Sequence, residues 1–368
     1  MEKPFGTTRK TLRPDLAMAA AVGAAMAFAG GQAQAFPPQD PPCPTSVLAP
    51  SGLDPKPVNK PHCPTTPNCL VTFKGYQWWT AYPFTSADGF YNDGLRTSFA
   101  PEHAFIGGDG NLHLKANNDI DLGDPGNTHP WSGGEAVLMF NGDGTEANLG
   151  YGTYLVTAQL VGGSWAALDP NMALGLFKYE RPATGPELNT VREIDLAEIS
   201  RWGWNHTGTC PIGGKNFNFP NNILCKGNAQ FALQQIMNAN AGQAPKMVDR
   251  YDIGDNDVVT LVMKWHQGPE GREVEFKKYK GARSLSDLPA VPDYPWKTDP
   301  DTTPTPPDFK TNVPPAVKEF IPHHTATSCE RFHINFWFGH YIDDKRPNPP
   351  PASPQEVIIT NFEFSPAK

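Results

Sequence analysis

The sequence predicts an all-β fold in one domain, and three observations support this prediction. Short runs recur along the chain that alternate polar and apolar residues or are rich in β-branched and aromatic residues, and both patterns are typical of strands. Turn segments such as Gly142-Asp143-Gly144 separate these runs. Apolar residues at helical spacing are nearly absent. Many short strands with glycine- and proline-rich turns indicate a β-sandwich or barrel.

Eight segments have the strand pattern most clearly. They are residues 111–115, 134–140, 151–160, 173–179, 258–265, 274–279, 332–338 and 357–364. The best helical candidate is the segment 228–239. No internal repeat interrupts this series, so the strands are expected to build one sandwich.

Residues 1–35 have the composition of a secretory signal peptide. Four basic residues precede an alanine-rich apolar run over 16–29, and the run is followed by Ala33-Gln34-Ala35, the small-x-small pattern of a cleavage site. The apolar run is too short and too rich in alanine for a membrane span. An uncleaved anchor is the alternative. We expect cleavage after Ala35, a secreted or periplasmic protein and no membrane association after cleavage.

The charge of the chain argues against nucleic-acid partners. The full sequence carries a net charge of −8, and residues 1–35 contain four basic and two acidic residues, so their removal would leave −10. A chain this acidic has no electrostatic attraction to nucleic acid. No basic amphipathic segment suggests an anionic membrane surface either.

All six cysteines follow the expected cleavage site. An even number in an exported chain predicts disulfide bonds. Cys63 with Cys69 and Cys210 with Cys225 are the natural local pairs, but the sequence leaves the connectivity open. No Cys-x-x-Cys motif points to a metal.

Two proline-rich stretches frame the organisation of the mature chain. Residues 36–69 are expected to form an extended leader, and residues 70–368 are expected to form the β-sandwich domain. Within that domain, the segment of about 281–322 is too long for an ordinary connection. It is predicted to be an insertion that serves as a functional loop or as a cover.

The run Glu193-Ile194-Asp195-Leu196-Ala197-Glu198 is the strongest candidate for chemistry. Side chains at i and i+2 of a strand share a face, so Glu193 and Asp195 lie together. Glu198 would point to the other face unless a β-bulge shifts the phase by one residue. With such a bulge the three acids share one face, and Ile194 and Leu196 face the core.

Carboxyl groups crowded in this way suit acid–base chemistry, because repulsion and burial hold a proton on one group while another stays ionised. Asp195 would hydrogen-bond to Glu193. The alternative interpretation is a half-solvated strand, in which polar residues simply face water, or a solvated helix.

This run resembles the Glu-x-Asp-x-x-Glu motif of family 16 glycoside hydrolases, in the bulge-bearing form of laminarinase-like members. Other segments resemble strands of that family in the family's order and extend the resemblance over roughly 70–368: Ser132-Gly133-Gly134-Glu135, Gly150-Tyr151-Gly152-Thr153-Tyr154, 332–339 and 357–364. There are departures. Trp165 is not part of a Trp-Pro-x-x-Trp segment, Val258-Val259 replaces a histidine, and the 281–322 insertion is atypical.

The resemblance implies a jelly-roll β-sandwich of the concanavalin A-like lectin/glucanase type, with a cleft on its concave face. It also implies endo-acting, retaining hydrolysis of a β-linked polysaccharide. By position, Glu193 becomes the nucleophile, Asp195 its assistant and Glu198 the general acid/base.

Tryptophans near the motif are candidates for sugar binding, because an indole ring offers a platform to the apolar face of a sugar. Trp165, Trp202 and Trp204 are the predicted substrate-binding residues, with core packing as the alternative. Trp265 and Trp337 lie in apolar strands and are predicted to be core. His333 is predicted to be a strand histidine whose strand could border the cleft.

The expected substrate is β-1,3- or β-1,3(4)-glucan. Within the same fold, a galactan hydrolase of the agarase or carrageenase kind and a transglycosylase are alternatives. A non-catalytic, lectin-like polysaccharide-binding module is the alternative from another class. No cofactor and no catalytic metal are expected, although a structural calcium ion with unknown ligands is compatible with such a fold. We expect a monomer.

Overall fold

The computed structural model describes residues 69–80, 97–118, 131–169, 172–180, 191–200, 228–236, 246–253, 258–268, 271–298, 321–322, 324, 330–338 and 353–367. All of them belong to one compact unit that spans Gly31–Lys368. Over these ranges no helix is long and apolar enough to cross a membrane. The one cysteine that is described, Cys69, is disulfide-bonded. The predicted pairings involve cysteines outside the described residues and stay predictions.

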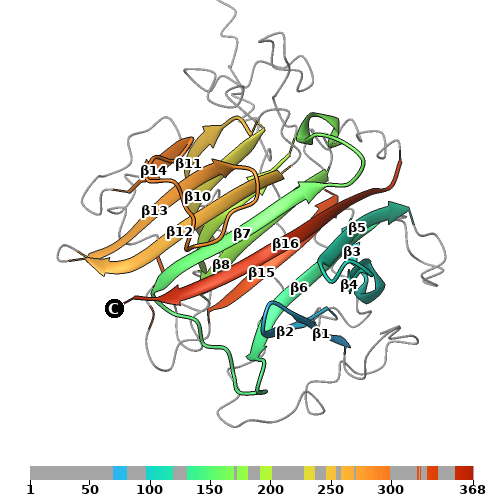
Figure 1. The fold of residues 1–368 in the computed structure, drawn as a ribbon, viewed down its shortest axis with the longest axis horizontal. Helices are drawn as coiled ribbons and strands as arrows, with labels where there is room; N and C mark the ends of the chain where they lie inside the picture. Colours follow the sequence, from blue (N-terminus) through green and yellow to red (C-terminus); the bar gives the residue numbers. More distant parts are fainter. Residues whose placement is uncertain are drawn as a thin grey trace, which may run out of the picture. The chain divides into compact units, whose positions relative to one another are not determined.

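The described strands form one hydrogen-bonded sheet that folds into two layers (Figure 1). The first layer consists of β1 (Leu70–Phe73), β2 (Tyr76–Trp79), β6 (Trp131–Asn141), β15 (Arg331–Phe338), β8 (Met172–Glu180), β9 (Val191–Ile199), β10 (Ala229–Ile236) and β11 (Lys246–Tyr251). The second consists of β4 (Ala104–Ile106), β5 (Leu112–Asn118), β16 (Gln355–Pro366), β7 (Gly152–Leu160), β12 (Val258–Gly268), β13 (Gly271–Lys280) and β14 (Tyr294–Lys297). Two short 3₁₀ helices, η3 (Pro101–His103) and η4 (Trp165–Ala167), lie between strands.

The layers are joined where β5 pairs with β6, beside the short parallel strand β3 (Thr97–Phe99). Pairings between strands that are distant in sequence hold each layer together. β15 lies between β6 and β8, and β7 lies between β16 and β12. The all-β class and the sandwich architecture predicted from the sequence are confirmed.

A single hydrophobic core fills the space between the layers. Alternate residues of facing strands contribute to it, such as Phe332, Ile334 and Phe336 from β15 and Tyr154 and Val156 from β7. All five side chains are at most 1 % exposed. Burial of one such side chain stabilises the fold by about 1.5–3 kcal/mol. The residues between them on β15 therefore point to the outer face of the first layer.

The helix expected over 228–239 is wrong, because this segment contains strand β10. Its central residues alternate in a period of two: Phe231 and Leu233 lie in the core, whereas Gln230 and Ala232 face outward. Strands β9 and β11 pair with β10 on both sides. These tertiary hydrogen bonds override the helical preference of alanine, glutamine and leucine.

Part of the predicted 281–322 insertion also forms regular structure. Strand β14 lies within it and pairs with β13, where Phe276 is opposite Trp296. The two rings stack with centroids 5.2 Å apart. This edge strand extends the second layer, and residues 299–320 of the insertion lie outside the described residues.

Trp165 belongs to the hydrophobic core, so its prediction as a substrate-binding residue is wrong. It lies in η4, has no exposed surface and packs in the same cluster as Leu160 and Leu168. Gln355 secures this region, since its amide donates to the carbonyl of Ala167 and its side-chain oxygen accepts from the backbone N–H of Asp169. The turn after β7 therefore directs the indole inward.

Replacement of Trp165 by alanine is expected to reduce the free energy of unfolding by about 3–5 kcal/mol, because it removes a fully buried aromatic side chain. Urea denaturation measures the loss. Trp296→Ala, on the edge strand and only partly buried, is the control and should cost less. An unchanged midpoint for Trp165→Ala would contradict the core assignment.

Candidate functional site

Strand β9 contains a β-bulge at the position that the acidic run requires. On its β8 side, the consecutive residues Leu176 and Phe177 pair with Ala197 and Asp195, so that Leu196 is passed over. The β10 side has the same irregularity: the register shifts between Gln230 and Ala232. Strand β9 thus carries one more residue than its neighbours, and the predicted bulge is confirmed.

The bulge divides the residues of β9 between the two faces of the layer. Four apolar side chains, Ile194, Leu196, Ala197 and Ile199, have no exposed surface and belong to the core. The three acids, Glu193, Asp195 and Glu198, share the outer face, because one extra residue changes the phase of the strand. The structure therefore brings Glu193, Asp195 and Glu198 to one face, as the sequence predicted.

The register fixes how far apart the two glutamates stand. Glu193 pairs with Gln234 and Glu198 with Gln230, so four residue steps of β10 separate them, or about 13 Å between Cα atoms at about 3.3 Å per step. Strand side chains stand roughly perpendicular to the sheet and lean along the strand, so the two glutamates rise from the same face with Asp195 between them.

The three carboxyl groups differ in burial. Asp195 is 1 % exposed and Glu193 is 8 % exposed, whereas Glu198 is half-buried. Gln230, which has no exposed surface, donates a hydrogen bond from Nε2 to Oε2 of Glu198. Glu198 is thus held on its β10 side, and it is the acid of the three that is most open to solvent.

A row of residues crosses the first layer at the level of Glu198. Direct pairing connects Gln230 to Glu198, Glu198 to Gly175, Gly175 to Asn335 and Asn335 to Glu135. Directly paired residues of antiparallel strands point to the same face. We call these five residues the polar row. The row places amide and carboxyl groups from β10, β15 and β6 in line with Glu198.

Glu135 at the end of the polar row forms a buried pair with His333. Oε1 of Glu135 lies 3.1 Å from Nδ1 of His333, and both residues are at most 1 % exposed. Burial raises the pKa of Glu135 to about 8, because an ionised carboxylate is costly away from water. The His333 ring stacks on Phe177, with centroids 4.9 Å apart, and Phe177 is itself the partner of Asp195.

Sequence reasoning assigned no role to Glu135 or Asn335. The signal was nevertheless visible in 332–338, where His333 and Asn335 interrupt an otherwise apolar run at a spacing of two. Such spacing places both residues on one face of a strand. His333 is the strand histidine that was predicted, and it shares the face of the candidate site.

The predicted tryptophans divide into three groups. Trp165 is core, and Trp202 and Trp204 lie outside the described residues. Trp265 is fully buried, as predicted. The prediction for Trp337 is wrong, because Phe336 beside it faces the core and Trp337 is partly exposed on the outer face.

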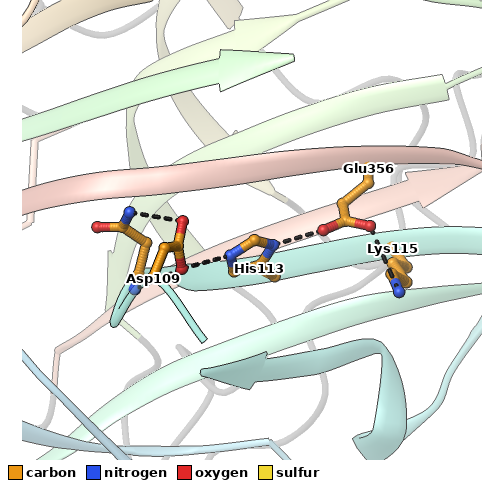
Figure 2. Close-up of polar contacts among 5 residues, drawn as sticks. Asp109, His113, Lys115 and Glu356 are labelled. Atoms are coloured by element: carbon orange, nitrogen blue, oxygen red, sulfur yellow. Dashed lines mark hydrogen bonds and ion pairs between the residues drawn. The ribbon is translucent and has the colours of Figure 1, made fainter. Parts of the chain in front are cut away.

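A second cluster of charged residues lies on the second layer, on strands β5 and β16 and the turn before β5 (Figure 2). His113 stands between two carboxylates: its Nε2 is 2.9 Å from Oδ1 of Asp109, and its Nδ1 contacts Oε1 of Glu356. Lys115 lies 3.4 Å from the other oxygen of Glu356. Both partners of His113 are carboxylates, so the array lacks the hydroxyl or thiol of a nucleophilic triad.

The His113 array connects the β4–β5 turn to β16. Burial lowers the pKa of His113, but hydrogen bonds to Glu356 and Asp109 outweigh burial, and the net pKa is raised. Hydrogen bonds from His113 and Asn111 lower the pKa of Asp109. The array therefore favours a protonated His113 beside the ionised carboxylate of Asp109, a stabilising arrangement. Within the described part of the chain, no group of three His, Cys, Asp or Glu side chains could hold a metal ion.

Comparison with known proteins identifies structural similarity only. No protein-family model and no curated protein matches the sequence. Among solved structures, a lichenase from a mouse hindgut metagenome is 16 % identical with a TM-score of 0.44, over 82 % of this chain and 98 % of the other. A laminarinase catalytic domain of Thermotoga petrophila is 12 % identical, with a TM-score of 0.44, over 80 % and 92 %.

The β-glucanase of Bacillus licheniformis is 14 % identical with a TM-score of 0.41, and the match covers 81 % of this chain and 95 % of the other. All three are β-glucanases, the class to which the sequence resemblance pointed.

Glu135→Gln is expected to change how stability depends on pH. The pKa of Glu135 is raised from 4.5 to about 8, so the folded protein retains a proton that the unfolded chain releases. Wild-type stability therefore contains a term that is fully present below pH 4.5 and is lost as the pH rises toward about 8. The glutamine variant lacks this term. Between pH 5 and pH 8, the free energy of unfolding of Glu135→Gln should therefore rise relative to that of wild type. If the two proteins showed the same dependence of this free energy on pH, the buried, protonated carboxyl would be contradicted.

His113→Gln tests the array of the second layer. Because the pKa of His113 is raised above 6.5, its contribution is fully present below pH 6.5 and is lost as the pH rises through the raised pKa. The melting temperature of the variant should fall below that of wild type near pH 5, by on the order of 1–3 °C, and approach it by pH 9.

His266→Gln is the matched control, since burial lowers the pKa of His266. Here the sign is opposite: the wild type should gain stability relative to this variant as the pH rises toward 6.5. The same trend for both histidines would contradict the array.

Proposed function

We propose that the chain is a secreted, endo-acting, retaining glycoside hydrolase that cleaves a β-linked polysaccharide. The observation that carries this proposal is the bulge of β9, which places Glu193, Asp195 and Glu198 on one face. Retaining hydrolysis needs two carboxyl groups that flank one bond, one as nucleophile and one as proton donor. Glu193 and Glu198 are the two glutamates that the bulge brings to the same face, which supports their assignment as this pair.

In the first step, Glu193 attacks the anomeric carbon and Glu198 protonates the departing glycosidic oxygen. The second step reverses these roles: Glu198 removes a proton from water, and the water displaces Glu193 from the sugar. Burial of Glu193 and Asp195 supports this assignment of roles, because a carboxylate with few water contacts is a stronger nucleophile. Asp195, two positions further along β9 and on the same face, would hold Glu193 in place.

The burial of acids argues for an enzyme rather than a binding module. Asp195 and Glu193 are at most 8 % exposed, whereas aspartate and glutamate side chains are mostly found at the protein surface. A sugar-binding surface recognises hydroxyl groups with amides and exposed carboxylates and does not require such crowding. Catalysis, which needs carboxyl groups with unequal proton affinities, does.

We favour a β-1,3- or β-1,3(4)-glucan as the substrate. A galactan hydrolase would use the same acids and would differ from the glucanase in the surroundings of the site. A transglycosylase would also use the same acids and would differ in the molecule that accepts the sugar. Trp337, partly exposed on the face of the site, is suited to stack against a sugar ring. The composition of residues 1–35, which is that of an export signal, supports an enzyme that acts on an extracellular polymer.

The test is product release from laminarin, lichenan, agarose and κ-carrageenan by wild type, Glu193→Gln and Glu198→Gln. We expect wild type to release short oligosaccharides from a glucan, and each variant to lose about 10³-fold or more in rate. Glu275→Gln, on the second layer, is the control and should retain full activity.

Equal binding of one glycan by wild type and Glu193→Gln, with no cleavage of any glycan, would favour the lectin-like module. Cleavage that survives in Glu193→Gln would contradict the assigned nucleophile.

A further inference from the structure

Gly175 lies between Glu198 and Asn335 in the polar row. It pairs with Glu198 across β9 and with Asn335 across β15. A Cβ atom at Gly175 would stand 2.4 Å from Oδ1 of Asn335, far closer than van der Waals contact. The amide of Asn335 therefore lies over Gly175 and occupies space that any other residue would fill. This position directs its oxygen from β15 toward the strand that carries Glu198.

Among the residues that the structure describes, none donates a hydrogen bond to the side-chain oxygen of Asn335. Asn335 is only 9 % exposed, and buried acceptors are nearly always hydrogen-bonded, either to protein or to water. Glu198 is held from the opposite side by Gln230. Oδ1 of Asn335 and the carboxyl of Glu198 are thus two acceptors on either side of a glycine.

The distances suit a water molecule between these acceptors. Strands β9 and β15 are two spacings apart, or about 9.6 Å, and Asn335 covers part of this distance by lying over Gly175. A water that donates two hydrogen bonds of about 2.8 Å, along O–H bonds that diverge by about 105°, spans about 4.4 Å between its acceptors. A side chain on residue 175 would displace the amide and close this space.

We propose that Asn335, seated on Gly175, holds the water that releases the sugar from Glu193. The inference rests on the proposed function, since it requires a glycosyl-enzyme intermediate and Glu198 as the base. One hydrogen of the water faces Glu198 and the other faces Oδ1 of Asn335. This arrangement directs the lone pair of the oxygen toward the anomeric carbon.

The step is balanced in atoms and electrons. The water oxygen forms a bond to the anomeric carbon, and the bond between that carbon and the carboxylate of Glu193 breaks, which returns its electron pair to Glu193. The proton facing Glu198 moves to Glu198. The second hydrogen stays on the new hydroxyl group and remains hydrogen-bonded to Asn335. Asn335 changes neither charge nor protonation.

The two chemical steps separate this role from simple glycan binding. With 2,4-dinitrophenyl β-laminaribioside as the probe, the leaving group needs no proton, so release of the sugar by water limits turnover. A residue that holds water acts on kcat alone. A residue that binds the glycan acts on kcat/KM, which reports the first step.

The experiment compares wild type with Asn335→Ala and Gly175→Ala on this probe by stopped-flow and steady-state kinetics. We expect kcat to fall about 5- to 15-fold in Asn335→Ala, the effect of one lost hydrogen bond, with kcat/KM unchanged within about twofold. A burst of one dinitrophenolate per enzyme should precede the slow phase. Gly175→Ala should change kcat in the same direction, because it displaces Asn335 without removing it.

Two further variants complete the design. Asn335→Asp keeps an acceptor and should retain more kcat than Asn335→Ala. The acidic limb of its kcat pH profile, where the base Glu198 becomes protonated, should move to higher pH because of the added negative charge beside Glu198. Asn361→Ala, on β16 of the second layer, is the matched control and should behave as wild type.

A fall in kcat/KM for Asn335→Ala without a burst would overturn the inference, because Asn335 would then bind the glycan in the first step. This result would not contradict the proposed hydrolase function. A burst in wild type equal to that in Asn335→Ala, with the same kcat, would overturn it as well. No release of dinitrophenolate by wild type would overturn both the glucanase proposal and the role of Asn335.

Discussion

The strict alternation of side chains along a β-strand is the constraint on which the candidate site depends. In β9 one face must supply Ile194, Leu196 and Ile199 to the core, and the other must carry three acids. A regular strand cannot do both, because Glu193 and Glu198 are five residues apart and would point to opposite faces. The extra residue at the bulge resolves the conflict. The core and the site are therefore specified by the same irregularity.

The neighbours of β9 determine what surrounds the acids. β10 contributes Gln230 as a donor to Glu198, and β8 contributes Gly175, which leaves room above the sheet. β15 and β6 contribute the amide of Asn335 and the buried pair of His333 and Glu135. Since β15 and β6 are distant in sequence from β9, the site is assembled by the long-range pairing of the sandwich. Its polar groups are fixed on strands, where packing limits their motion.

The fold class and the acidic run could be predicted from the sequence because both follow from local periodicity. Alternation identified strands such as 332–338, and the spacing of Glu193, Asp195 and Glu198 required a bulge. The segment 228–239 was predicted wrongly because its alanine, glutamine and leucine residues favour a helix, and only pairing with β9 and β11 makes it a strand. Trp165 was assigned to the site because proximity in sequence to the motif does not reveal that η4 turns it into the core. The role of Asn335 and Gly175 could not be predicted, because it depends on the strand register that places both residues in line with Glu198.

The most direct test of the central claim is the identification of the residue that becomes covalently attached to the sugar. Incubation with 2,4-dinitrophenyl 2-deoxy-2-fluoro-β-laminaribioside slows both chemical steps and lets the intermediate accumulate, and mass spectrometry of peptic peptides locates the label. We predict one fluoroglycosyl group per chain, attached to Glu193. A label on Glu198 or another residue, or cleavage of a glucan with inversion at the anomeric carbon, would contradict the assignment of Glu193 as nucleophile on the bulged strand.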